Sequence, residues 1–250
     1  MADWWEEMFS SEAWQEVQRN WSAVEDTTDQ AERVIEALGL DEGARVLDVP
    51  AGDGRIALEL GAAGFEVVGV DLIEAFIEAG RRDAEKRRIE NVTLEVGDMR
   101  ELSYEAEFDA AICFWGSFGY FDEAGNLAQA AAVARALKPG GRYLIDTPSL
   151  ETLYPRFRER TWFQIADTIV LQEAILVMGT GRIETEWIFV RGGVAEETHR
   201  TSMRVYSVHE LTELLREAGF ESFELRDDEL FDFEVGSQRL WLIASTGEDG

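Results

Sequence analysis

From residue 44 onward, short apolar runs alternate with stretches whose apolar positions recur at helical spacing. The apolar runs have the length and β-branched content of buried strands: ARVLDV, EVVGV, VTLEV, FDAAICF and RYLIDT. The helical stretches include RIALELGAAG, IEAFIEAGRRDAEKRR and EAGNLAQAAAVARAL. This alternation predicts a parallel sheet covered by helices on both faces, and right-handed crossovers restrict it to a doubly wound α/β fold. Ligands of such folds bind at the carboxyl ends of the strands.

The pattern changes after the fifth apolar run. Residues 161–206 contain several β-rich runs and no amphipathic helix, and the sequences GTG and RGG separate these runs as hairpin turns do. We therefore expect an antiparallel sheet inserted after the fifth strand. A helical pattern returns at Ser207, whose S-x-x-E box with Glu210 starts a helix, and final strands are expected near 221–227 and 238–245.

These patterns divide the chain into three units. Residues 1–43 are expected to form an N-terminal helical segment that acts as a lid or a docking element. Residues 44–150 and 207–246 are expected to form the ligand-binding α/β domain, and residues 151–206 a sheet that caps an acceptor pocket.

The N-terminal segment is rich in aromatic residues, namely Trp4, Trp5, Phe9, Trp14 and Trp21. Trp14 and Trp21 are seven positions apart, so they lie on one face of a helix. Two interpretations stay open. The segment is a lid that bound ligands order, or it docks onto the domain or onto a second subunit, and both a monomer and a homodimer are compatible with the sequence.

Composition narrows the choice of partners and compartments. The chain carries 51 acidic and 23 basic residues, and its net charge of −28 argues against nucleic acid as a partner. No window approaches 18 uninterrupted apolar residues, and the N-terminus lacks a basic region, so neither a membrane span nor a secretory signal is expected. The single cysteine, Cys113, excludes an internal disulfide and a CxxC metal site. From these features we expect a cytoplasmic protein.

The stretch VLDVPAGDGR, residues 46–55, combines an acid, a proline and two glycines at the end of the first predicted strand. Together with Asp71 after the next strand, GDGRIA fits the G-x-G-x-x-A pattern of nicotinamide dehydrogenases. Asp48 argues against that reading, because a carboxylate there repels a pyrophosphate and favours a ligand with an ammonium group. Pro50 and Ala51 also separate the strand from the first glycine.

The chain resembles the class I S-adenosylmethionine-dependent methyltransferases from about Ala44 to Ser245. Four motifs occur in order: the glycine loop, VVGVDL after the second strand, GDM after the third, and LKPGG before the fifth. The resemblance implies a Rossmann-like, seven-stranded methyltransferase sheet. Pro50 at the first glycine position and Ala51 where cysteine is frequent depart from the common pattern. The LDVP form and the SFGYF segment are similar to one branch of small-molecule methyltransferases.

The resemblance implies S-adenosylmethionine as cofactor, S-adenosylhomocysteine as product, and a role for each motif residue. Asp48 would bind the amine of the ligand, and Gly52 and Gly54 would let the backbone approach it. Asp71 would accept the ribose hydroxyls and Asp98 the adenine amino group. The cofactor-binding residues implied are Asp48, Pro50, Ala51, Gly52, Asp53, Gly54, Asp71, Leu72, Asp98, Met99, Phe114 and Trp21. Structural alternatives are helix N-caps for Asp71 and Asp98 and core packing for Met99, Phe114 and Trp115.

The segment FWGSFGYF after the fourth strand is the expected floor of the acceptor pocket. The expected pocket residues are Trp115, Ser117, Phe118, Tyr120, Arg204 and Tyr206. Tyr120 is a candidate base, with a buried aromatic turn as the alternative. His199 is a second candidate base, because alternation does not decide which face of its strand looks inward. Arg204 would bind an acceptor carboxylate or phosphate, unless it lies at the surface.

The leading hypothesis is a small-molecule methyltransferase acting on nitrogen or oxygen by in-line displacement. The inserted sheet resembles, by architecture, that of N-methyltransferases of amino sugars and amino acids. A regulatory protein that binds the cofactor without turnover, and an NAD-dependent oxidoreductase, remain alternatives. The charge disfavours RNA or protein methylation, and no clustered Asp/Asn set supports a metal-dependent enzyme, so no metal is expected.

Overall fold

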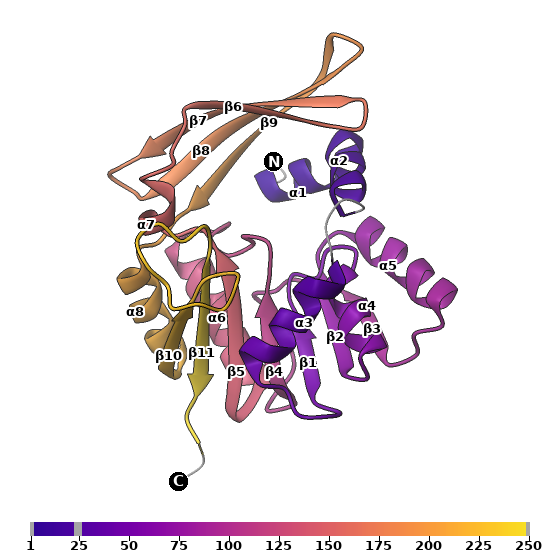
Figure 1. The fold of residues 1–250 in the computed structure, drawn as a ribbon, viewed down its shortest axis with the longest axis vertical. Coiled ribbons are helices and arrows are strands. Elements are labelled where there is room, and N and C mark those ends of the chain that lie inside the picture. The colour runs from indigo at the N-terminus through magenta and orange to yellow at the C-terminus, as the bar shows by residue number, and fades with distance from the viewer. Residues whose placement is uncertain (1–2, 23–26, 249–250) are drawn as a thin grey trace.

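The computed structural model describes residues 3–22 and 27–248 (Figure 1). Its larger sheet has the order β10-β11-β5-β4-β1-β2-β3. Strands β1 to β5 run parallel, and β11 is antiparallel to both β5 and β10. The strands are β1 (Arg45–Asp48), β2 (Glu66–Asp71), β3 (Val92–Val96), β4 (Phe108–Cys113), β5 (Leu137–Thr147), β10 (Phe220–Arg226) and β11 (Leu240–Thr246). The seven-stranded, doubly wound sheet predicted from the sequence is confirmed.

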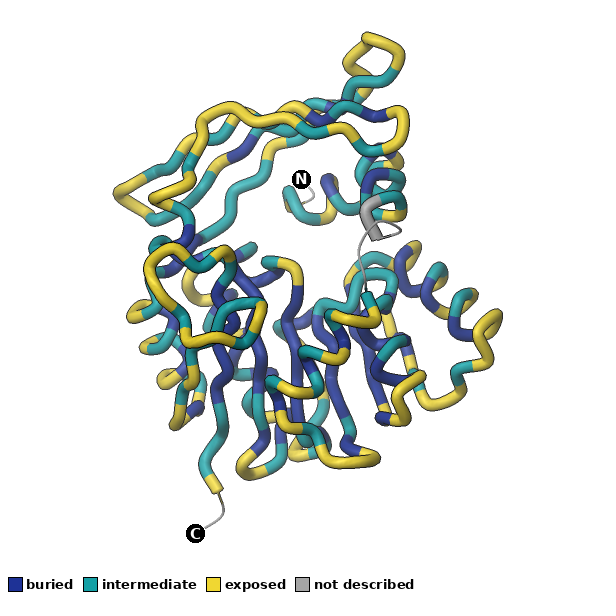
Figure 2. Tube along the Cα trace, in the orientation of Figure 1, coloured by how far each residue is buried: buried dark blue, intermediate teal, exposed yellow. Residues whose placement is uncertain are grey.

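Helices cover both faces of this sheet because successive strand residues point to opposite sides. Val46 of β1 belongs to the cluster formed with α3, α4 and α5, and its neighbour Leu47 belongs to the cluster formed with α6 and α8. The central strands β1, β2, β4, β5 and β11 are correspondingly buried along most of their length, whereas the edge strands β3 and β10 are largely exposed or half-buried (Figure 2). The covering helices are α3 (Thr27–Leu38), α4 (Arg55–Ala62), α5 (Glu74–Arg87), α6 (Glu123–Ala136) and α8 (Val208–Ala218).

The insertion after β5 begins with the short helix α7 (Leu150–Leu153) and forms a four-stranded antiparallel sheet. Its strands are β6 (Arg160–Ile165), β7 (Thr168–Val177), β8 (Arg182–Arg191) and β9 (Val194–Arg204). The sequences GTG and RGG lie at two of its hairpin connections, as predicted. The chain then returns through the predicted capping box, in which Ser207 and Glu210 exchange hydrogen bonds at the start of α8.

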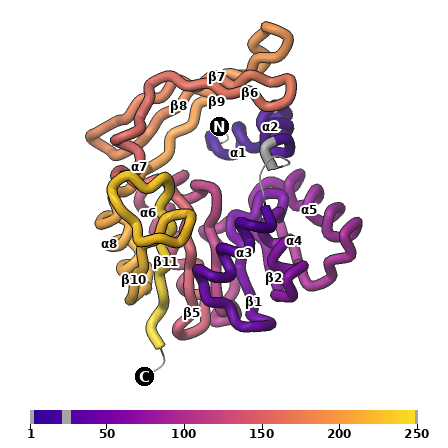
Figure 3. Tube along the Cα trace, in the orientation of Figure 1, coloured from indigo at the N-terminus to yellow at the C-terminus, as the bar shows by residue number. Residues whose placement is uncertain are grey.

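The N-terminal segment is divided between two places. Helix α3 packs against α4 and β5 of the larger sheet. Helices α1 (Trp4–Phe9) and α2 (Glu12–Ser22) instead lie beneath the four-stranded sheet, between it and the larger sheet (Figures 1 and 3). Met8, Val17, Val170 and Phe189 are the centre of the apolar cluster that joins these helices to β7 and β8. No helix among the described residues is long and apolar enough to cross a membrane.

Candidate active site

A cavity of about 450 Å³ lies at the carboxyl ends of the parallel strands, beneath α1, α2 and the four-stranded sheet. This volume is within the range of small-molecule sites. Its walls come from the loops after β1, β2, β3 and β4, from the two N-terminal helices, and from β6, β7 and β8. The predicted residues that line it are Asp48, Pro50, Ala51, Gly52, Asp53, Asp71, Leu72, Asp98, Met99, Phe114, Trp115, Ser117 and Tyr120.

The loop between β1 and α4 presents its backbone to this cavity. The Val49–Pro50 peptide bond is cis, and the Ala51 N–H donates to the carbonyl of Val70 at 2.9 Å. Gly52 and Gly54 have φ angles of +59° and +75°, which L side chains rarely adopt. A Cβ on Gly54 would also lie 3.0 Å from the side chain of Leu94. Glycine at both positions is therefore required by the backbone path.

Asp48 and Asp71 end adjacent parallel strands and are both buried. Burial, together with the charge of Asp71, raises the pKa of Asp48 to about 8. Burial also raises the pKa of Asp71, although the N–H groups of Ile73 and Gly52 donate to its two oxygens at 2.9 and 2.8 Å. Asp53, in the glycine loop, likewise has a pKa raised by burial.

The two strand-end carboxylates and the glycine loop fit S-adenosylmethionine. Each oxygen of Asp71 accepts one backbone N–H and retains a second lone pair, which suits two ribose hydroxyls held by one carboxylate. Asp48 is a buried acid whose ionised form an ammonium group would stabilise. The bare backbone of Gly52 completes the cradle, where a Cβ would come within 3.4 Å of the Gln18 amide nitrogen.

Asp98 and Met99 lie on the adjoining wall, after β3. Asp98 accepts the Arg100 backbone N–H at 2.8 Å and its guanidinium Nη2 at 2.6 Å. Burial opposes ionisation of Asp98, but these hydrogen bonds and the charge of Arg100 lower its pKa. Asp98 is therefore an ionised acceptor on the same cavity wall as buried Phe76 and exposed Leu72.

The loop after β4 holds Trp115 in an unusual conformation. Its φ angle is +64°, uncommon for a residue other than glycine. Asp146, at the end of β5, accepts the Trp115 N–H at 2.9 Å through its carboxylate, and Arg239 donates to that carboxylate at 2.5 and 2.8 Å. The Arg55 guanidinium lies 4.0 Å from the centre of the Trp115 ring. These contacts fix the indole as one wall of the cavity.

Ser117 and Tyr120 place polar atoms on the same loop. The Ser117 hydroxyl donates to the carbonyl of Phe114 at 2.9 Å, and the Tyr120 hydroxyl donates to Ser117 Oγ at 3.3 Å. Burial raises the pKa of Tyr120 above its ordinary value, so the phenol stays neutral at physiological pH. Its geometry suits orientation of a ligand better than proton removal.

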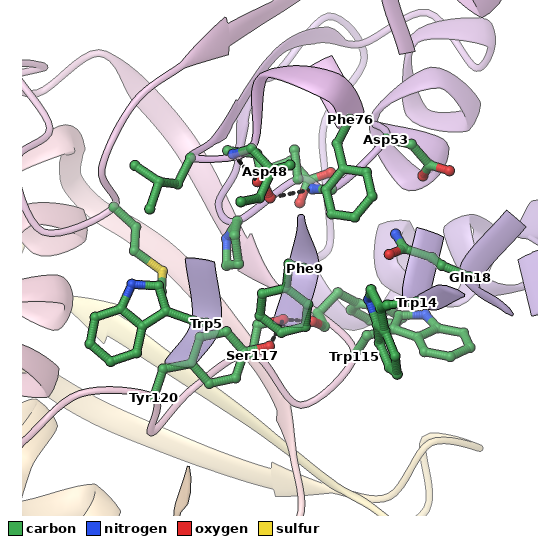
Figure 4. Close-up of a pocket in the computed structure, with 18 of the residues that line it drawn as sticks. Trp5, Phe9, Trp14, Gln18, Asp48, Asp53, Phe76, Trp115, Ser117 and Tyr120 are labelled. Carbon is green, nitrogen blue, oxygen red and sulfur yellow. Dashed lines mark hydrogen bonds between the residues drawn. The ribbon is translucent and has the colours of Figure 1, made fainter. Parts of the chain in front are cut away.

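The cavity has two chemically different halves (Figure 4). Its acidic half consists of the strand-end and loop carboxylates Asp48, Asp53, Asp71 and Asp98. Its aromatic half consists of Trp5, Phe9, Trp14, Tyr120, Phe121, Phe163 and Trp187. Figure 4 shows Asp48 and Asp53 above this group, with Trp5, Phe9, Trp14 and Tyr120 below them.

Several predicted residues are not brought to the cavity. Gly54 is the N-cap residue of α4 and shapes the loop without lining the cavity, and Phe118 is buried in the core beneath it. The side chain of Trp21 lies outside the described part of the structure.

The predictions for Arg204 and Tyr206 as pocket residues are corrected by the structure. Arg204 donates to Glu123 and Glu210, each at 2.8 Å, and the Tyr206 hydroxyl donates to Glu123 at 2.9 Å. Both side chains lie where the inserted sheet rejoins α6 and α8. Strong carboxylate partners hold them there, away from the cavity.

His199 also lies away from the cavity, contrary to its prediction as a base. It is directly opposite Trp187, so it shares the inner face of the sheet. Its Nε2, however, lies 2.9 Å from Glu197 Oε2, and Glu197 also accepts the N–H of Ala13 at the start of α2. His199 therefore belongs to the contact between β9 and α2.

Sequence reasoning missed other lining residues. Arg55, which lines the cavity, follows the second glycine of the loop directly. Asp146 does not line the cavity but holds Trp115, and it lies one residue before the end of β5, close to where Asp48 and Asp71 end their strands. That position was the available signal for Asp146. No sequence signal marked Phe163 and Trp187 as lining residues, because their placement depends on how the inserted sheet docks.

Comparison with known proteins agrees with this geometry. Residues 46–141 match the family described as "Methyltransferase domain". The putative methyltransferase YqeM of Bacillus subtilis is 29% identical over 226 residues, which are 86% of this chain and 89% of that protein. The ubiquinone/menaquinone biosynthesis C-methyltransferase UbiE of a Geobacter species is 34% identical over 130 residues, 50% of this chain and 54% of that enzyme.

Two solved structures show the same fold. An S-adenosylmethionine-dependent methyltransferase from Clostridium acetobutylicum has a TM-score of 0.76 at 18% identity, with 90% of this chain and 94% of that chain covered. CalS10, an amino pentose methyltransferase from Micromonospora echinaspora, has a TM-score of 0.69 at 20% identity, with 94% and 98% covered. With the methyltransferase domain matched over the glycine loop and the first four strands, the predicted enzyme class and cofactor are confirmed: the protein is an S-adenosylmethionine-dependent methyltransferase.

Proposed function

We propose that the protein methylates a nitrogen or oxygen atom of a small-molecule acceptor, as members of the small-molecule branch of methyltransferases do. The observation that carries the proposal is the division of one cavity into an acidic and an aromatic half. The acidic half suits a cationic, hydroxyl-rich cofactor, and the aromatic half suits a second, less polar molecule beside it.

Each part of the chain has a distinct task in this proposal. Asp48 binds the ammonium group, Asp71 the ribose hydroxyls, and Asp98 and Met99 the adenine. Phe114 and Trp115 contact the reacting end. When bound, S-adenosylmethionine supplies the activated methyl group, so the residues around it align the acceptor and exclude water.

The proposed cap consists of residues 151–206 together with the N-terminal helices. Rings from α1, α2, β6 and β8 close the aromatic half over the carboxyl ends of the parallel strands. Methyltransferases with a similar fold, such as CalS10 and the sugar N-methyltransferase KedS8, support a small-molecule acceptor.

Calorimetric titration tests the cofactor site. S-adenosylmethionine and S-adenosylhomocysteine should bind the wild type, and Asp71→Asn should weaken both at least tenfold, because the amide cannot accept at both ends. Asp41→Asn, at an exposed acid outside the cavity, is the matched control. Binding of NADH in place of both would contradict the proposal. Turnover is then tested with labelled methyl donor against small amines, phenols and carboxylic acids.

A further inference from the structure

The aromatic half of the cavity is built from rings of three separate segments. Phe9 of α1 lies 5.5 Å from Tyr120 of the β4 loop, and Trp14 of α2 lies 5.6 Å from Trp187 of β8. Trp5 contacts Phe121 at 4.8 Å. The pairs are tilted or edge-to-face, so the walls combine flat ring faces and ring edges. Such walls favour a planar aromatic molecule, which can stack and meet ring edges at once.

The aromatic half contains no group suited to accept a proton. Among the described residues that line the cavity there is no histidine, lysine, cysteine or glutamate. The four aspartates that line it belong to the acidic half, and burial keeps Tyr120 neutral. His199, the other predicted base, is bound to Glu197 outside the cavity. An acceptor must therefore reach its reactive form without a base from this part of the protein.

Two cationic side chains line the cavity beside Trp115 and Gly116, where the loop after β4 meets it. Arg55 lies over the Trp115 ring, and a Cβ on Gly116 would be 3.9 Å from Arg239 Nη2. Both arginines line the cavity, and Arg239 also binds Asp146. Guanidinium groups stay protonated at all physiological pH values. Beside Trp115 they favour an ionised hydroxyl over an ammonium group. An ammonium group also lacks the lone pair needed for attack, and the described residues of the aromatic half offer no base to remove its proton.

We propose that the acceptor is a planar aromatic molecule with an acidic hydroxyl, which is methylated on that oxygen. This rests on the proposed function and selects oxygen over nitrogen within it. The hydroxyl ionises and gives its proton to water. An oxygen lone pair then forms the new O–C bond, and the C–S bonding pair stays with sulfur, which leaves as the neutral thioether. No oxidant, metal or further co-reactant enters this balance.

The first test compares three acceptors of similar ring size with labelled methyl donor: 2-naphthol, 2-naphthylamine and 2-(aminomethyl)naphthalene. The expected kcat/KM for 2-naphthol exceeds that of either amine at least tenfold. The arylamine tests a neutral nitrogen, and the alkylamine tests the ammonium that the arginines oppose. An amine that matches or exceeds 2-naphthol overturns the proposal.

The pH profile gives a second, independent readout. With ring-substituted phenols of graded acidity, the midpoint of the kcat/KM profile should move with the pKa of each phenol. A midpoint that stays fixed across the series would mean that a group of the enzyme removes the proton, which contradicts the proposal.

A pair of variants tests whether the acceptor binds in the aromatic half of the cavity. Phe163 lines the cavity, whereas its neighbour Trp162 is 67% exposed on the opposite face of β6. Phe163→Leu should raise the KM for 2-naphthol at least fivefold with little change in S-adenosylmethionine affinity, and Trp162→Leu should change neither. Equal effects of the two substitutions would contradict the placement.

Failure of the acceptor class can be separated from failure of the proposed function. If S-adenosylmethionine does not bind, the proposed function fails first. If it binds and 2-naphthol is neither methylated nor bound by the S-adenosylhomocysteine complex in calorimetry, the acceptor class fails while the cofactor site stands.

Discussion

Asp48 is held in a state that favours ligand binding at the cost of stability. It is 2% exposed, with Asp71 at the end of the adjacent strand. The carboxyl group of a ligand-free protein is therefore neutral below about pH 8. A bound ammonium group would allow it to ionise, so the interaction that the ligand supplies is one that the ligand-free protein lacks.

The stability of the ligand-free protein should depend on the pH through this group. Its pKa is 3.8 without perturbation and about 8 when folded, so the unfolded chain loses the proton first. The free energy of unfolding therefore falls as the pH rises from 3.8 to about 8. Asp48→Asn should remove this part of the slope and stabilise the protein at pH 8.5 by on the order of a few kcal/mol.

Urea denaturation of both proteins between pH 5 and pH 9 checks this expectation. The raised pKa values of Asp53 and Asp71 give the same sign in both proteins, so the difference between the curves isolates Asp48. Parallel curves would contradict it. The variant should bind S-adenosylmethionine weakly even though it is more stable.

Asp146 joins three parts of the site through one carboxylate, which receives the Trp115 N–H and the Arg239 guanidinium. Asp146→Ala would leave the Trp115 N–H without its acceptor and Arg239 without its carboxylate partner. Since Arg239 is partly solvated, we expect a loss of about 2–3 kcal/mol, and a smaller loss for Asp146→Asn. The exposed pair Arg200–Glu186 is the control, because Arg200→Ala should cost less than about 1 kcal/mol. Similar losses for both would contradict this assignment.

At the scale of elements, the N-terminal helices belong with the inserted sheet. Arg191 of β8 donates to Glu16 of α2 at 2.6 Å, and Glu197 of β9 accepts from Ala13. On their other side, Trp5 and Phe9 contact rings of the β4 loop. The helices are therefore a bridge between the two sheets, in addition to α7, the end of β9 and Arg182 of β8, which donates to carbonyls of the loop after β4.

Deletion of residues 1–22 should separate the two halves of the cavity functionally. It removes Trp5, Phe9 and Trp14 from the aromatic half and, among the side chains that the structure describes, Gln18 from the neighbourhood of the glycine loop. We expect S-adenosylmethionine to bind within about tenfold of the wild-type affinity, and methyl transfer to fall at least a hundredfold. Calorimetry and the labelled-methyl assay measure the two effects, with circular dichroism as the check on folding. Loss of both activities to the same degree would contradict this division.

The larger sheet was predictable because each of its elements carries a local signal. Buried parallel strands are continuous apolar runs, and the acids that end β1 and β2 mark the ligand edge. The alternation of residues along β9 predicted which residues share a face of the strand, but it did not predict which face is directed towards the cavity. That depends on the docking of α1 and α2, which covers His199, and on Glu123 and Glu210, which hold Arg204. Long-range packing of this kind has no signature within one strand.

At the scale of the whole molecule, charge should distinguish cofactor from product. The protein carries a net charge of −28. S-adenosylmethionine has a sulfonium, an ammonium and a carboxylate group, whereas S-adenosylhomocysteine lacks the sulfonium. We expect the affinity for S-adenosylmethionine to fall more steeply with salt than that for the product, because only the former has a net charge to be screened. Calorimetry at about 50 mM and about 500 mM salt measures this. Equal salt dependence would contradict the expectation.

The separate origins of the two halves of the cavity have a consequence for how the protein can change. The acidic half comes from loops of the larger sheet, which also forms the main core, whereas much of the aromatic half comes from α1, α2 and the inserted sheet. Substitutions in β6 and β8 can therefore reshape acceptor preference without disturbing the cofactor loops. A library confined to cavity-facing positions of those strands would be a rational starting point for directed evolution towards new acceptors.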